Sequence, residues 1–191
     1  MTAGSFPWLE LTLLAPLLGA GVTAFIKTPA AAARWAIGFI LAVSAGALGT
    51  AVEFLTADAA AVSSHGTFKA DEIAAPMLPV LAVLHLLTLL GTSKSRMTPS
   101  FCARLLLSAF ATMAAVTSQS GSVLIALMIA AALLPVWDLK SRGRRARGFL
   151  FYVVPFIGLL LIGWTFSDGA RPVWAVGLLL LALKLCGGIV P

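Results

Sequence analysis

The sequence predicts an all-α membrane protein, a polytopic bundle of about seven transmembrane helices. Apolar residues make up 60% of the 191 residues and charged residues 10%, whereas about a quarter of the residues in an ordinary soluble domain are charged. The apolar residues form runs long enough for helices that cross a hydrocarbon core of about 30 Å. These runs do not alternate apolar and polar residues, as a transmembrane β-barrel requires.

Seven apolar runs are the candidates for these helices in a single transmembrane domain. The predicted spans cover about residues 7–26, 35–55, 74–92, 101–117, 123–137, 149–166 and 172–191. Trp8 is expected to anchor the first span at the membrane interface. Pro29 is expected in the short turn before the second span, and Pro76 and Pro79 interrupt the start of the third. The many Gly and Ala residues of the second span favour close contact between helices.

The basic residues give the helices a direction. A topology cluster follows the fifth span: Lys140, Arg142, Arg144, Arg145 and Arg147. Each of these would cost roughly 2.5–3.5 kcal/mol at the centre of a membrane helix. The loops after spans one, three and five hold nine cations, and the loops after spans two, four and six hold two. The nine are Lys27, Arg34, Lys94, Arg96 and the topology cluster, and the two are Lys69 and Arg171.

This bias places the N-terminus outside and the basic loops in the cytoplasm, and we expect a bacterial inner (cytoplasmic) membrane. No cationic region precedes the first span, so it is not expected to be a cleaved signal peptide. The net charge of +6 does not indicate nucleic acid, because the cations lie at the ends of apolar runs. Cys102 and Cys186 fall within predicted spans, where small packing residues are the expectation. No metal or cofactor motif is found, so the sequence predicts neither.

Two titratable residues inside predicted spans are the proton-path candidates. Lys184 lies about 12 residues into the seventh span, roughly 18 Å from its outer end. Intramembrane lysines usually face a bundle interior or a hydrated path, although Lys184 could instead snorkel to the cytoplasmic interface. His85 lies near the middle of the third span, where it could relay protons or simply bond to a neighbouring helix. Glu10 and Glu53 are expected at the interfaces, and Asp138 can pair with Arg142.

Three segments resemble the antiporter-like membrane subunits of respiratory complex I (NADH-quinone oxidoreductase), membrane-bound hydrogenases and multi-subunit cation/proton antiporters. Residues 69–76, KADEIAAP, are similar to the family's D-G-(L/I)-S-A-P at the start of its third helix. Leu133–Leu134–Pro135, a basic loop and an aromatic-rich sixth span follow the family's order. Residues 182–191, ALKLCGGIVP, resemble its lysine-bearing seventh helix. The likeness covers the whole chain, although full-length members have about fourteen helices, so the chain would represent their N-terminal portion.

The resemblance implies a non-redox membrane subunit of a proton-translocating complex. Its expected partners are the other membrane and peripheral subunits of that complex, and the lipid bilayer surrounds it. It would contribute a proton half-channel or a structural remnant of one. Ala130 stands where the family has an essential glutamate, and Cys186 stands where its helix-seven lysine is expected, two residues after Lys184. Two alternatives remain. One is a subunit of an inorganic-carbon uptake or cation/proton antiport system, and the other is a non-conducting structural scaffold.

Overall fold

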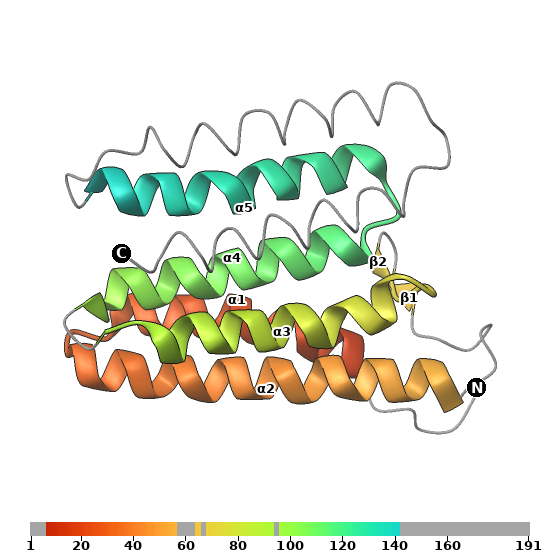
Figure 1. Ribbon diagram of the computed structural model, residues 1–191, viewed down its shortest axis with the longest axis horizontal. Helices are drawn as coiled ribbons and strands as arrows, with labels where there is room; N and C mark the ends of the chain where they lie inside the picture. The colour runs from red at the N-terminus through yellow and green to blue at the C-terminus, as the bar shows by residue number, and fades with distance from the viewer. Residues whose placement is uncertain (1–6, 57–63, 66–67, 94–95, 142–191) are drawn as a thin grey trace.

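The computed structural model describes residues 7–56, 64–65, 68–93 and 96–141, which form five helices lying side by side and a short β-hairpin (Figure 1). The helices are α1 (Trp8–Phe25), α2 (Pro29–Thr56), α3 (Ala74–Gly91), α4 (Pro99–Thr117) and α5 (Gly121–Ser141), and the hairpin joins β1 (Ser64–His65) to β2 (Phe68–Lys69). The all-α class is confirmed, and within these residues α1 to α4 are long and apolar enough to cross a membrane. The ranges 149–166 and 172–191 lie outside the described residues, so seven spans stay a prediction.

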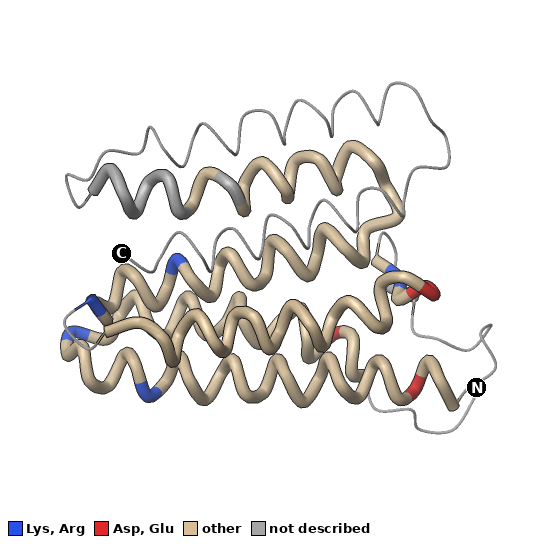
Figure 2. Tube along the Cα trace, in the orientation of Figure 1, with Lys and Arg blue, Asp and Glu red and all other residues tan. Residues whose placement is uncertain are grey.

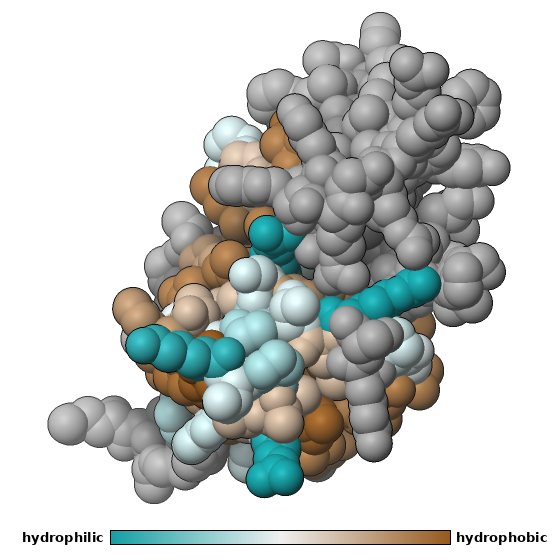
Figure 3. Space-filling model, turned by 90° about the vertical axis from the view of Figure 1, so that its left-hand side faces the viewer, coloured by the Kyte–Doolittle hydropathy of each residue, from teal (hydrophilic) through white to brown (hydrophobic). Residues whose placement is uncertain are grey.

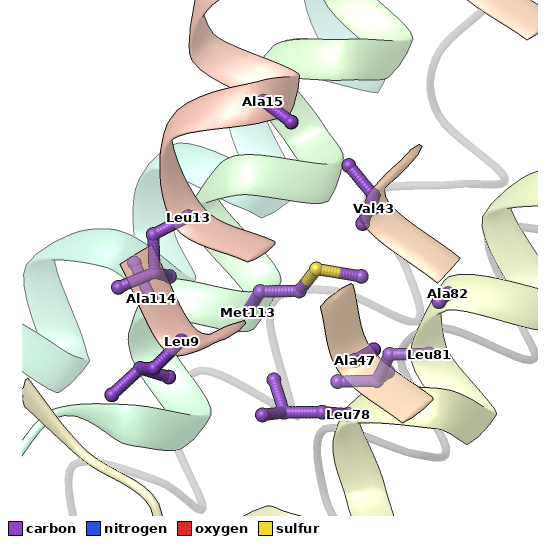
Figure 4. Close-up of a cluster of buried hydrophobic side chains, with 10 residues drawn as sticks. All are labelled: Leu9, Leu13, Ala15, Val43, Ala47, Leu78, Leu81, Ala82, Met113 and Ala114. Carbon is purple, nitrogen blue, oxygen red and sulfur yellow. The ribbon is translucent and has the colours of Figure 1, made fainter. Parts of the chain in front are cut away.

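The central helix of the bundle is α4. It packs against α1, α2, α3 and α5, and Figure 1 draws it between α5 and the other three helices. One apolar cluster gathers side chains from four helices around Met113 of α4, among them Leu9 of α1, Val43 of α2 and Leu81 of α3 (Figure 4). The core therefore lies along α4, with α5 packed on the opposite side from α2.

Small residues bring α1 and α2 into close contact. A Cβ atom added to Gly46 of α2 would lie 2.7 Å from Thr12 Oγ1 and 3.3 Å from the carbonyl oxygen of Trp8 in α1. The indole ring of Trp8 covers Gly49, one turn further along α2. Of the glycines predicted to allow close helix contact, Gly46 lies against the backbone of α1 and Gly49 against the side chain of Trp8, whereas Gly38 faces open space.

Local sequence explains where the helices begin. Pro29 is the first residue of α2, so the expectation that it lies in a turn is wrong. Proline suits this position because the first residue of a helix needs no backbone N–H donor. Before α4, the side chain of Thr98 accepts a hydrogen bond from the backbone N–H of Phe101. Before α3, Asp71 Oδ1 accepts from the backbone N–H groups of Ile73 and Ala74 at 3.1 and 2.7 Å.

Successive helices run antiparallel, with the hairpin between α2 and α3, so the bundle has two distinct ends. Among the described side chains, one end carries cations only, and we call it the basic end: Lys27, Arg34, Arg96 and Arg104. The other, the acidic end, carries Glu10, Glu53, Asp71 and Glu72 together with Lys69. Figure 2 shows this separation along the bundle. The hairpin lies at the acidic end, where Phe68 pairs with Ser118 just after α4.

Candidate functional site

His85 lies inside the bundle, at the contact between α3 and α4. Only 7% of its surface is exposed, and its Nε2 atom lies 3.0 Å from the hydroxyl oxygen of Thr112 in α4. The two residues are 27 positions apart in the sequence, so this hydrogen bond joins two helices that the chain brings together only on folding. The hydrogen bond from His85 to a neighbouring helix, one of the two roles expected for it, is therefore present in the structure.

The surroundings of Thr112 indicate which atom donates. The Thr112 hydroxyl lies within 3.0 Å of the carbonyl oxygens of both Ser108 and Ala109, one turn earlier in α4. A hydroxyl has one hydrogen, and here it is directed at these carbonyls, so its oxygen acts as the acceptor for His85. We therefore assign the neutral imidazole as the tautomer protonated at Nε2, with the lone pair at Nδ1.

The two sides of His85 differ in polarity along the bundle. Toward the acidic end, α3 contributes Leu78, Leu81 and Ala82 to the apolar cluster of Figure 4. Toward the basic end, Thr88 of α3 and Thr92, the residue just after α3, are both buried. Thr88 follows His85 by three residues, so the two lie on the same face of α3. The polar side chains of α3 thus extend from His85 toward the basic end.

The threonine hydroxyls inside the bundle are bonded to the helices that carry them. Thr88 donates to the carbonyl of Leu84 at 2.8 Å, and Thr92 donates to the carbonyl of Thr88 at 2.7 Å. Four further threonines in α1, α2 and α4 make the same bond to a carbonyl four residues earlier: Thr12, Thr23, Thr50 and Thr117. Such bonds satisfy the hydroxyl donors locally, so these side chains need no water for burial.

The other predicted residues lie apart from His85 or outside the described residues. Glu10 lies in the first turn of α1 and Glu53 in the last turn of α2, both partly buried at the acidic end. Ala130 lies on an exposed side of α5. Lys140 lies in the last turn of α5, whereas Lys184 and the four arginines of the topology cluster lie outside the described residues.

The sequence analysis did not single out Thr112 or Arg104. Ser108 and Thr112, four residues apart in an apolar run, are the signal that could have indicated a polar face on α4. Arg104 was visible as a charge inside the fourth predicted span, and it lies in the second turn of α4, partly buried near the basic end. Within the described residues, no three His, Cys, Asp or Glu side chains gather where they could hold a metal ion. Cys102 is a free, buried thiol in the apolar packing around α4.

Comparisons with protein-family models, curated proteins and solved structures found no match for this chain.

Proposed function

We propose that this chain is a membrane subunit of a proton-translocating complex, similar in role to the antiporter-like subunits of respiratory complex I. In this proposal it contributes a proton half-channel, or a structural remnant of one, and partner subunits supply the driving reaction. The observation that carries the proposal is His85, a titratable side chain buried mid-helix in a membrane-length helix and bonded to a second helix. Ionisable residues in such positions are expensive to keep and are usually functional.

The bond to Thr112 suits a residue that gains and loses a proton. With the neutral imidazole donating from Nε2, an incoming proton would bind at Nδ1. The protonated ring then donates from both nitrogens, so its bond to Thr112 Oγ1 persists in both states. The pair would therefore hold the ring in one orientation while its charge changes. Lys184 is the second residue proposed for this path, on the strength of its place in the predicted seventh span.

A non-conducting scaffold is the second candidate, and one observation favours it. The buried threonines beside His85 donate to carbonyl groups of α3 itself, and Thr112 does so within α4. The described residues thus contain satisfied hydroxyls rather than a continuous side-chain relay from His85 to either end. A scaffold would keep His85 as a neutral contact between α3 and α4.

Proton pumping by the intact complex in reconstituted vesicles tests the proposal. His85→Gln keeps a side-chain N–H that can bond to Thr112 but cannot carry a proton at neutral pH, and Lys184→Ala removes the second candidate. His65→Gln is the matched control, since His65 is the other histidine of the chain and lies in β1. We expect the first two variants to lose pumping by about a hundredfold or more, the scale of losing a proton-transfer group, while His65→Gln pumps normally.

A native gel establishes that each variant assembles into the complex. Lys184→Arg keeps a cation at position 184, so it separates the need for a charge from the need for a group that releases a proton. Normal pumping in both His85→Gln and Lys184→Ala, with assembly intact, would rule out a half-channel through these residues. The chain would then be a scaffold.

A further inference from the structure

The cations of the basic end come from separate segments that the fold brings to one place. Lys27 lies between α1 and α2, Arg34 lies in the second turn of α2, and Arg96 lies between α3 and α4. The neighbours of two of them pack on the same apolar cluster: Ile26 precedes Lys27, and Met97 follows Arg96. The α1–α2 corner and the α3–α4 loop are therefore adjacent, and their cations share one surface.

The same surface carries exposed aromatic side chains beside the charges. Trp35 follows Arg34 and is 55% exposed, and its ring lies 6.1 Å from that of Phe39 one turn further along α2. Phe25, two residues before Lys27, is 88% exposed. Figure 3 views the molecule from this end and shows hydrophilic side chains projecting around the face, with hydrophobic surface on its flanks. Charges meet apolar surface here as they do at the interface of a membrane.

The described acidic side chains lie at the opposite end of the bundle from Lys27 and Arg34. Arg34 and Glu53 are 19 residues apart on the continuous helix α2, which corresponds to about 29 Å. The Debye length at physiological ionic strength is about 8 Å. Among the described side chains, the basic end thus carries cations and no acidic residue.

We propose that the basic end holds an anionic phospholipid headgroup between the α1–α2 corner and the residues just before α4, 96–98. Lys27, Arg34 and Arg96 contact its phosphate, and Trp35 and Phe25 pack against its glycerol and upper acyl chain. An acidic protein could neutralise the positive charge, but it would leave the two exposed aromatic side chains in water. A phospholipid can contact both the cations and the aromatic side chains. Its phosphate and its acyl chains are joined, just as Arg34 and Trp35 are adjacent in α2. This site does not depend on proton translocation.

Native mass spectrometry of the purified full chain tests the site. The probes are phosphatidylglycerol, which is anionic, and phosphatidylcholine, which is zwitterionic, each titrated into detergent solution. The test variant is Lys27→Gln with Arg34→Gln, two exposed positions, and the matched control is Lys69→Gln at the acidic end. A juxtamembrane cation contributes about fivefold to binding of anionic lipid, so the double variant should bind phosphatidylglycerol roughly 25-fold more weakly.

We expect Lys69→Gln to bind phosphatidylglycerol as the unaltered chain does, and Trp35→Ala to weaken both lipids. Arg34→Lys keeps the charge, so it should keep most of the affinity for phosphatidylglycerol. It thereby controls for effects of a substitution at position 34 on folding. Equal binding of both lipids by the unaltered chain would overturn the proposal. So would an equal loss in Lys69→Gln and in the double variant. Binding of an acidic peptide in place of phosphatidylglycerol would assign this surface to a protein partner instead.

Discussion

Replacing Gly46 with alanine is expected to weaken the contact between α1 and α2 measurably. The new Cβ would lie 2.7 Å from Thr12 Oγ1 and 3.1 Å from the backbone nitrogen of the same residue. The hydroxyl is already held by a 2.8 Å bond to the carbonyl oxygen of Trp8. The backbone of α1 cannot yield as a flexible side chain does, so the two helices must move apart or the local packing must rearrange.

Gly38 provides a matched control on the same helix, because a Cβ added there meets nothing within 4 Å. Alanine is favoured over glycine in a helix by about 1 kcal/mol, and both variants gain this. Overpacking costs about 1–3 kcal/mol, and only Gly46→Ala incurs it. Gly46→Ala should therefore be less stable than Gly38→Ala by about 1–3 kcal/mol, which is roughly a 5- to 150-fold difference in the unfolding equilibrium.

Unfolding in mixed micelles of a mild detergent and dodecyl sulfate, followed by circular dichroism, measures this difference. The two variants have the same composition, so denaturant binding to the unfolded chain is matched. If Gly46→Ala proves as stable as Gly38→Ala, then α1 and α2 do not approach as closely as the structure has them. The account of the core would then be wrong at its closest contact.

Two further substitutions test single hydrogen bonds by the same unfolding measurement. Thr112→Val removes the acceptor of the buried His85 N–H and should lower the free energy of unfolding by about 1–3 kcal/mol. The double variant His85→Leu/Thr112→Val leaves neither partner of this bond unsatisfied, so it should lose less stability than the sum of the two single variants. A loss equal to that sum would argue against the bond. Asp71→Ala removes the acceptor at the start of α3 and should cost about 0.5–2 kcal/mol, whereas the exposed neighbour Glu72→Ala should stay within about 0.5 kcal/mol. Equal losses from the last two would contradict the capping role.

The helical class could be predicted because apolar runs of membrane length leave the backbone few alternatives. Within lipid, only helices and closed barrels satisfy every backbone polar group, and these runs do not alternate as barrel strands do. Helix starts were harder to predict. Pro29 was assigned to a turn, because the sequence alone does not distinguish a helix-breaking proline from one at the first position of a helix. α2 therefore begins six residues before the predicted span.

Of the two residues that form the candidate site, only His85 could be predicted from the sequence. His85 was found because a titratable residue in an apolar run is conspicuous, but its partner depends on how α3 and α4 align. Thr112 is one of several threonines in membrane-length helices, and only the packing shows that it faces His85 rather than lipid. The close contact of Gly46 with Thr12 could not be predicted for the same reason, since composition predicts close packing without naming the partner.

The orientation of the bundle constrains any proton path through His85. Its polar neighbours on α3 extend toward the basic end, and the side toward the acidic end is filled by Leu78, Leu81 and Ala82. If the proposed half-channel exists, its described part therefore opens toward the basic end. The cations there would raise the electrostatic potential at the opening and lower the local proton concentration. A bound anionic headgroup would offset that potential, so the lipid site, although independent of translocation, would also favour protonation of His85 from that side.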